Sequence, residues 1–536
     1  MWAALAKIGV PERIIRAIQT LYKDMYTFIL CGGALHLGFD MTGGVAQGCP
    51  LAAALYVIST DCFGRLLIGR LKDDLAIGTY IDDTNLVLKH FAENIATLQA
   101  SFVVLEKATG LKLNGGKCTA IPLDPVARSC IRATLSLAGG IWSLCRVKKT
   151  AKLLGIFVGP GASLRSWTKP MQKMRQRTLA IKDLQLGLAR TSVLFNAVAF
   201  SCVAYIASLC VAPHSVCKIA NRLFHKLTSM PFNAMPAEVI HGLSRISMGA
   251  SIFHLGTFQQ AAKLRVFASL PELEEQWNSV TILVPGNVED HFRHPLHHWL
   301  SKSICSGLVN NYRDLCSLPD VCECFGKPKL QRTVYLELRK TKPPLDPSVG
   351  LQRRMLHFDP DAAEDAGDFI ARWMPVVASS LGPGVVGASL KVMCNGLNTS
   401  SRYRNTSTGG LELDCKFCYH LGGDNLRHLL SCPQVSLALA DAAGYHDLPL
   451  DENIAVRFFC WLDTPSAEQM KIRAVIVDFI VKAYQQVPEN ACFLTMRGAL
   501  RRSIAARIAH WTRFGRHGYS LVLDSARRSR GAAARR

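Results

Sequence analysis

The alternation of apolar and polar residues over the first 160 positions predicts a mixture of helices and short strands. The predicted helices cover 1–7, 12–26, 51–67 and 91–109, and the predicted strand segments cover 28–39, 75–89, 112–122 and 147–158. Gly110 follows the last of these helices, where glycine is a frequent C-terminal cap. The interleaving of both kinds of element indicates an α+β domain.

The remainder of the chain is predicted to be mainly helical with an irregular middle. Residues from Ser166 to about Met230 have a helical pattern that is basic at its start, and the end from Gln469 is helical and then arginine-rich. The range 285–383 is rich in Pro, Gly and His, so we expect irregular structure there. The run 194–213 is apolar over the ~20 residues that would span a bilayer, but it contains polar residues, and we interpret it as a buried helix.

The charge of the chain favours a polyanionic partner. Lys and Arg number 62 against 40 Asp and Glu, which gives a net charge of +22. Nucleic acid is the first candidate partner and a membrane surface the second. An apolar content of 49% excludes a disordered chain. The nineteen cysteines do not form a compact disulfide framework and no secretory signal is found, so we expect a nuclear or cytoplasmic protein.

Residues 80–83, Tyr-Ile-Asp-Asp, place the adjacent carboxylates of Asp82 and Asp83 at the tip of a predicted hairpin. A tight turn would project both carboxylates beyond the strands, where they could hold a divalent metal ion. Such pairs also arise by chance, and we interpret Asp73 and Asp74 as part of a solvated loop. For Asp82 and Asp83 an ordinary hairpin turn is the alternative.

The segments around this turn follow the order of motifs in a known family. GGVAQGCPLAAALY lies about thirty residues before Tyr80, GLKLNGGKC about thirty after it, and KLLGIFVG at 152–159. Together with Tyr-Ile-Asp-Asp these segments resemble motifs B to E of reverse transcriptases, and Gln-Gly-Cys-Pro-Leu is most similar to the form in non-LTR retrotransposons. The opening helices, with Gly-Val-Pro at 9–11, resemble the stretch between motifs A and B. The resemblance covers residues 1 to about 215.

The resemblance implies roles for these residues. Asp82 and Asp83 would be catalytic carboxylates that hold Mg²⁺ ions between the primer 3′-oxygen and the nucleotide phosphates. Lys117 would lie near the leaving pyrophosphate as a general acid or an electrostatic group, with a solvated surface lysine as the alternative. The residues that would contact primer, template or nucleotide are Tyr80, Gly44, Gln47, Gly48, Pro50, Leu154 and Gly155.

The chain also departs from the family pattern. Ala46 stands where a basic residue is usual and Ala53 where a serine often occurs, and both changes are expected to tune binding. The motif A aspartate and the fingers would precede Met1, and neither Asp40 nor Asp61 is placed to replace that aspartate. We therefore expect this chain by itself to be inactive as a polymerase.

A second motif, C-x2-C-x9-H-x3-C, consists of Cys415, Cys418, His428 and Cys432. Zinc prefers four sulfur or nitrogen ligands in tetrahedral geometry; a Cys-x2-Cys turn supplies two, and residues four apart on a helical turn supply two more. The motif is similar to the zinc knuckle that follows the polymerase in many non-LTR retrotransposon proteins. Buried free cysteines are the alternative, and His420 is an alternative ligand.

Two further groups are basic or sulfur-containing. The resemblance implies that the basic residues at the start of the thumb-like region would contact duplex phosphates, with solvated charges as the alternative; these residues are Lys169, Lys173, Arg175 and Arg177. The segment 501–536 has ten Arg against one acidic residue and is a candidate for non-specific nucleic-acid binding. Cys322 and Cys324 lack matched partners and are interpreted as ordinary thiols.

The sequence thus predicts an α+β fold, with a polymerase palm that has an antiparallel sheet and packed helices, a mainly helical thumb, and a small zinc-knuckle module. The expected domains are the palm at 1–160, the helical thumb and connection at 161–283, an irregular connector at 284–405, the knuckle at 406–445 and a helical, basic end at 446–536.

The function expected from the resemblance is extension of a primer 3′-hydroxyl on an RNA template, with Mg²⁺ as catalytic and Zn²⁺ as structural ion. The expected partners are an RNA template, a DNA primer or target and deoxynucleotide triphosphates, with no membrane and no obligate protein partner. A catalytically dead remnant that binds nucleic acid is the alternative. A splicing cofactor like the group II intron maturases is a third hypothesis, which the Gln-Gly-Cys-Pro form and the late zinc motif disfavour.

Overall fold

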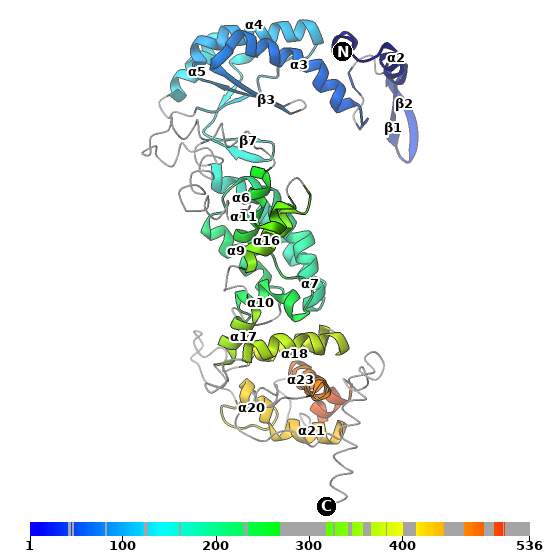
Figure 1. Cartoon of the computed structure of the whole chain (residues 1–536), viewed down its shortest axis with the longest axis vertical. Helices are drawn as coiled ribbons and strands as arrows, with labels where there is room; N and C mark the ends of the chain where they lie inside the picture. Colours follow the sequence, from blue (N-terminus) through cyan, green and yellow to red (C-terminus); the bar gives the residue numbers. More distant parts are fainter. Residues whose placement is uncertain are drawn as a thin grey trace, which may run out of the picture. The chain divides into compact units, whose positions relative to one another are not determined.

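The computed structural model describes most of the chain, and Figure 1 shows the order of its elements. The described residues are 1–40, 44–45, 48–80, 83–122, 127–159, 162–228, 230, 234–268, 318–324, 327–340, 346–356, 366–381, 383–399, 414–443, 466–486, 498–506 and 509. The chain divides into two compact units, Met1–Ala151 and Lys152–Arg536. The first is a mixture of helices and short strands and the second is mainly helical.

The first unit begins with two short helices that pack on a longer one. Helices α1 (Trp2–Lys7) and α2 (Glu12–Leu21) meet the start of α3 (Ala52–Leu71), and Leu5, Ile15 and Leu55 form the buried centre. Helix α2 was expected to reach residue 26. It ends at Leu21 because Asp24 turns the chain with a φ of 53°, and Tyr26 already pairs in a strand.

Strands β1 (Tyr26–Cys31) and β2 (Ala34–Asp40) form an antiparallel hairpin. Its turn is Gly32-Gly33 with φ of 60° and 85°, a pair of left-handed positions that glycine adopts without strain. The large apolar side chains exposed on this hairpin are Tyr26, Phe28, Ile29, Leu30, Leu35, Leu37 and Phe39. Backbone pairing and the turn, rather than core packing, therefore define this hairpin.

A second antiparallel hairpin lies against helices. Strands β3 (Leu75–Tyr80) and β4 (Asp83–Leu88) direct alternate apolar residues toward α3 and α4 (Phe91–Thr109). Helix α4 ends at Gly110, whose φ of 74° confirms the predicted glycine cap. The buried centre contains Phe63, Leu67, Leu98, Leu135 and Trp142.

The strands expected at 112–122 and 147–158 are much shorter in the structure. They reduce to β5 (Thr119–Ala120), which pairs in parallel with β6 (Arg146–Val147), and to β7 (Ala151–Leu153) and β8 (Ile156–Val158). A helix that the sequence did not predict, α5 (Ala127–Ala138), lies between β5 and β6. The fold is thus mixed and helix-rich with small sheets.

The second unit is built around a buried helical segment. Helix α6 (Ala162–Asp183) packs on α7 (Leu188–Leu194), on the π-helical turn η3 (Phe195–Phe200) and on α8 (Ser201–Leu209). It buries Trp167, whose indole Nε1 donates to the carbonyl oxygen of Val211 at 3.1 Å. The further helices of this part are α9 (His214–His225), α10 (Ala237–His241), η4 (Leu243–Ile246) and α11 (Leu255–Ala268).

Two helices of the described chain, Ala52–Asp74 and Leu188–Leu209, are long and apolar enough to span a membrane by length and composition alone. The second contains most of the run that was interpreted as a buried helix. Phe195, Ala199 and Val203 lie fully inside the core of its unit. The packing of this face supports the interpretation as a core helix.

The range 284–405, expected to be irregular, contains several helices in its described residues. These helices are α15 (Pro319–Cys322), α16 (Leu330–Lys340), α17 (Pro347–Met355), α18 (Ala366–Leu381) and α19 (Pro383–Met393). The expectation is wrong there because the prolines were interpreted as helix breakers. Three of the helices instead begin at a proline, where the missing N–H is not needed.

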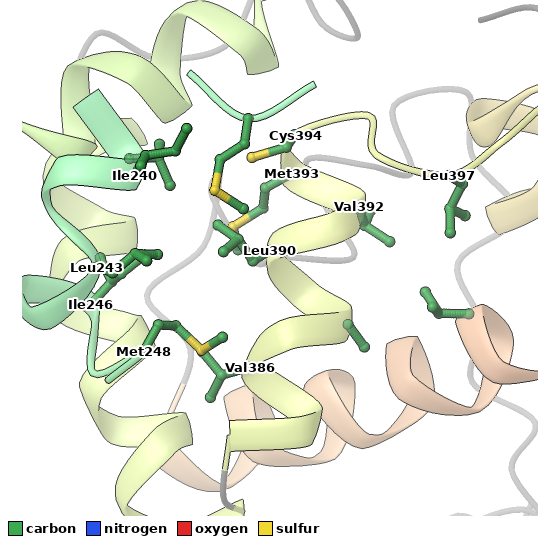
Figure 2. Packing of buried hydrophobic residues seen from close by; sticks show 14 of the residues in the cluster. Ile240, Leu243, Ile246, Met248, Val386, Leu390, Val392, Met393, Cys394 and Leu397 are labelled. Carbon is green, nitrogen blue, oxygen red and sulfur yellow. The ribbon is translucent and has the colours of Figure 1, made fainter. Parts of the chain in front are cut away.

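Helix α19 joins this range to the core of the second unit. In Figure 2, Val386 and Leu390 of α19 face Met248 and Leu243 across the buried cluster. Helices α18 and α19 also pack on α23 (Ala467–Gln486), which is buried on nearly all sides from Ala474 to Val481. The Cys and His motif lies next to α23, around α20 (Leu426–Ser431) and α21 (Pro433–Ala443).

Candidate metal centre

The four predicted zinc ligands lie together. The ligand atoms of Cys415, Cys418, His428 and Cys432 are all within 4.8 Å of one another. Sγ of Cys415 is 3.9 Å from Sγ of Cys432, and Sγ of Cys418 is 3.0 Å from Nε2 of His428. A tetrahedral zinc ion with Zn–S bonds of about 2.3 Å separates two sulfurs by about 3.8 Å. The group could therefore hold a metal ion such as zinc.

The first two ligands are positioned by a tight turn. The amide of Tyr419 donates to the carbonyl oxygen of Cys415 at 2.8 Å, and Tyr419 itself has a left-handed φ of 59°. The amide of Cys415 donates to the carbonyl oxygen of His420 at 3.0 Å, which closes the loop from the other side. The amide of Phe417 points at Sγ of Cys415 at 3.5 Å. The turn thus directs both sulfurs to one point.

The other two ligands depend on a helix cap that the sequence motif did not include. Oδ1 of Asn425 accepts a hydrogen bond from the amide of His428 at 2.8 Å and so caps α20. Its Nδ2 donates to the carbonyl oxygen of Gly422 at 3.1 Å. Asn425 therefore connects the loop after the first two ligands to the helix that carries the third and leads to Cys432.

Gly423 and His420 lie against the ligands without belonging to the group. A Cβ on Gly423 would meet the carbonyl oxygen of His420 at 2.8 Å and Cβ of Cys415 at 3.0 Å, so a side chain would push the ligand turn apart. The ring of His420 stacks on that of His428 with centroids 4.8 Å apart and an angle of 7°. His420 was an alternative ligand, but among the described residues the group that could hold a metal does not include it.

The ligand turn is held against α23 through Tyr484. Lys416 donates to the carbonyl oxygen of Tyr484, and its Nζ lies 3.7 Å from the centre of that ring. Phe417, which is 2% exposed, meets the same ring edge-on. The Tyr484 hydroxyl donates to Oδ1 of Asp424 at 2.9 Å and also contacts the carbonyl oxygen of Asn398 at 3.2 Å. One tyrosine thus contacts both sides of the ligand loop.

The thiols of the group differ in acidity because they are close together. A hydrogen bond from Cys432 lowers the pKa of Cys415, and the same bond raises the pKa of Cys432. Burial raises the pKa of Cys418. Cys415 is therefore the first of these thiols to lose its proton. A bound cation would stabilise the thiolates of Cys418 and Cys432, whose formation is unfavourable without it.

The second candidate site is the carboxylate turn of the first unit. Tyr80 pairs with Asp83 as the last pair of the antiparallel β3–β4 ladder. Both Asp83 and Tyr80 are exposed. Ile81 and Asp82 lie outside the described residues. The exposed Lys117 is the last residue of the turn at 114–117, and no hydrogen bond or ion pair within the described chain joins it to Asp83.

The described residues of the glycine-rich segment adopt conformations that favour glycine. Gly44 and Gly48 both have φ of 90°, and no atom lies within 4 Å of a Cβ built on either. The backbone conformation, rather than close packing, thus favours glycine. Pro50 lies at the turn that leads into α3. Gln47 lies outside the described residues.

Leu154 and Gly155 were expected to lie within the palm, but they belong to the second unit. They form the turn between β7 and β8 with φ of 44° and 95°. The Tyr205 hydroxyl donates to the carbonyl oxygen of Leu154 at 2.5 Å, and a Cβ on Gly155 would lie 3.0 Å from the Tyr205 ring. This turn is therefore fixed by α8, which the sequence could not indicate.

The basic residues of α6 lie on its exposed side. Lys169, Lys173, Arg175 and Arg177 are exposed. On the opposite side of the helix Trp167, Met174 and Thr178 are buried. Arg177 also donates a hydrogen bond to the carbonyl oxygen of Val198 at 2.8 Å, so it links α6 to the segment η3. The segment 510–536, with most of the C-terminal arginines, lies outside the described residues.

Comparison of the chain with models of protein families and with curated proteins finds no match.

Proposed function

We propose that this chain is a polymerase domain of the non-LTR retrotransposon type, in which Asp82 and Asp83 would serve the extension of a primer 3′-hydroxyl on an RNA template. The observation that carries the proposal is the β3–β4 hairpin. Tyr80 and Asp83 form the last pair of its antiparallel ladder. The three sequence motifs that flank the hairpin in the family's order support the same function.

The packing of the hairpin supports its use as a metal platform. Leu75 and Ile77 of β3 and Leu86 of β4 contact the core formed with α3 and α4, while Asp83 is exposed. A rigid base with an exposed acidic tip holds its carboxylates in place before the ion arrives. Asp82 and Asp83 would be the Mg²⁺ ligands, and the ion would align the primer oxygen and the phosphates for in-line transfer.

Primer extension tests the proposal directly. A labelled DNA primer on an RNA template is incubated with deoxynucleotides, Mg²⁺ and the full chain. Any extension that the wild-type chain supports should be abolished in Asp82→Asn and in Asp83→Asn, because each substitution removes one negative charge from the site. Asp73→Asn is the matched control, since Asp73 is exposed on the same unit in the loop before β3. Extension by the Asp83→Asn variant at the wild-type rate would exclude this site.

A second candidate function is nucleic-acid binding without catalysis. Among the described residues, the Cys and His group is the only set of three or more side chains that could hold a metal ion. Asp83 therefore belongs to no described group of three or more such side chains, and a two-metal reaction needs several carboxylates. Binding of an RNA–DNA duplex by the wild-type chain, with no extension in Mg²⁺, would favour this function over polymerisation.

We also propose that the Cys and His group binds one zinc ion as a structural centre. All four ligands are supplied by the protein, which is typical of structural zinc and leaves no open position for a substrate. Cys415 and Cys432 are buried and the loop is anchored on Tyr484. Metal analysis of the purified chain should give about one zinc per molecule, and Cys418→Ser with Cys432→Ser should remove it. A zinc-free wild-type chain with the same fold would exclude the proposal.

A further inference from the structure

Two cysteines of the first unit lie directly before two strands that pair with each other. Cys118 precedes β5 and Cys145 precedes β6, and the parallel register pairs Thr119 with Arg146. The amide of Arg146 donates to the carbonyl oxygen of Cys118 at 3.1 Å. Neighbouring strands lie about 4.8 Å apart. This spacing is within the range of about 4.4–6.8 Å between Cα atoms that a disulfide can bridge.

The two thiols are close enough to affect each other's acidity. Interaction with Cys145 lowers the pKa of Cys118, and interaction with Cys118 raises the pKa of Cys145. The thiol of Cys118 donates to the carbonyl oxygen of Asn114 at 3.3 Å. Both cysteines are free and half-buried, so each sulfur remains within reach of a small molecule. The backbone register and the mutual effect on acidity therefore agree that these two sulfurs face each other.

We propose that Cys118 and Cys145 form a reversible disulfide in the presence of a low-molecular-weight disulfide such as oxidised glutathione. The Cys118 thiolate attacks one sulfur of the oxidant, and this sulfur stays bound to Cys118 as a mixed disulfide. The other sulfur of the oxidant leaves as a thiolate and takes up a proton to give the first thiol. Cys145 then loses its proton and attacks the Cys118 sulfur, which releases the second thiol. The two protein thiols are oxidised, and one oxidant disulfide is reduced to two thiols.

The order of attack follows from the acidity of the pair. Burial raises the pKa of both thiols, and interaction with Cys118 adds to the rise at Cys145, which reaches about 11. Interaction with Cys145 opposes the rise at Cys118. Cys118 is therefore the better nucleophile, and Cys145 is the resolving thiol. The reaction should accelerate as the pH rises, because the reacting species is a thiolate.

The bond would close a loop that contains β5 and α5 and ends directly before β6. Only two residues of each strand are paired, so few backbone hydrogen bonds hold these segments now. A covalent link would restrict the turn at 114–117, which directly precedes Cys118. This modification site does not rest on the proposed polymerase function, since it requires only the geometry of the first unit.

Peptide mapping tests the proposal on the full chain. The protein is treated with oxidised glutathione, alkylated and digested with trypsin without reduction. We expect peptide 118–128 to be linked to peptide 133–146. Cys130 is an internal control, because it is exposed on α5 between the two and lies in its own peptide, 129–132. It should carry glutathione and no cross-link to either peptide.

Two variants identify the partners. Cys145→Ser should leave Cys118 as a stable glutathione adduct, and Cys118→Ser should slow modification at Cys145 at least tenfold at neutral pH. Both variants keep the backbone register, and circular dichroism checks their folding. A stable adduct on Cys118 in the wild-type chain, or full alkylation of both cysteines after treatment, would overturn the proposal.

Discussion

Removal of the Asn425 side chain tests how the ligand group is organised. In Asn425→Ala the protein loses the bond to the amide of His428 at 2.8 Å and the bond to the carbonyl oxygen of Gly422 at 3.1 Å. Loss of a helix cap costs about 0.5–2 kcal/mol, and a further neutral hydrogen bond costs about 1 kcal/mol. We take about 1–2 kcal/mol for the sum, because water partly replaces both partners.

This loss should appear mainly as weaker zinc binding. Asn425 orients the helix that carries His428 relative to the loop that carries Cys415 and Cys418. Without the cap, zinc binding itself must order the loop and the helix that carry the ligands. The lost free energy therefore weakens zinc binding. An energy of about 1–2 kcal/mol corresponds to a roughly 5–30-fold higher Kd. Competition with a chromophoric zinc chelator measures that change.

Asp346→Ala is the matched control. Asp346 caps α17 in the same way, because its Oδ1 accepts from the amide of Ser348 at 3.0 Å and from its hydroxyl at 2.8 Å. We expect a similar loss in the free energy of unfolding with no change in zinc affinity. The reasoning is refuted if Asn425→Ala binds zinc as tightly as the wild type, or if Asp346→Ala weakens zinc binding equally.

Three further predictions concern packing, pH and charge. Gly115→Ala should reduce stability by about 1–3 kcal/mol or more in urea unfolding, because the new Cβ would overlap the carbonyl oxygen of Ile141. Burial lowers the pKa of Lys263 to about 7, so above that pH the unfolded chain holds a proton that the folded chain has released. The free energy of unfolding should therefore rise between pH 7 and 10, and this rise should be smaller in Lys263→Met. Replacing Lys169 and Lys173 by Ala should reduce the slope of log K for duplex binding against log salt concentration by the equivalent of about two phosphate contacts.

Each of these predictions has a control and a contradicting result. Gly116→Ala should change stability by less than about 1 kcal/mol, because the nearest atom to its Cβ is 3.5 Å away. An equal effect of both glycine variants would contradict the packing argument. A pH slope that is the same with Met at position 263 would contradict the lysine assignment. Lys182 lies in the last turn of α6. If Lys182→Ala reduced the salt dependence of duplex binding as much as the substitutions of Lys169 and Lys173, the total charge and not the position of these lysines would decide binding.

Local features were predictable wherever one residue type decides the geometry. Gly110 ends α4 because the left-handed cap favours glycine, and the alternation at 75–88 predicts the β3–β4 hairpin that the structure has. The spacing of Cys415, Cys418, His428 and Cys432 predicted that these side chains meet. These predictions use contacts between residues near in sequence, whose geometry the backbone itself constrains.

Prolines show where local interpretation failed. Pro319 and Pro347 were interpreted as marks of irregular structure, yet each begins a helix. Proline interrupts the interior of a helix but is well suited to its first turn. Whether a proline begins a helix therefore depends on whether the residues after it pack into a hydrophobic core. Helix α17 finds one, because Leu351 and Met355 are fully buried.

The amino-acid sequence by itself determined the end of α4 at Gly110, the hairpin of residues 75–88 and the spacing of the metal ligands. Only the tertiary structure decided that Leu154 and Gly155 belong to the second unit, that Tyr484 anchors the ligand loop, and that Cys118 faces Cys145. These contacts join residues far apart in sequence, and the many apolar residues of the chain could pair in many other ways. Burial and strand register select one of these pairings, and neither is encoded by a local pattern.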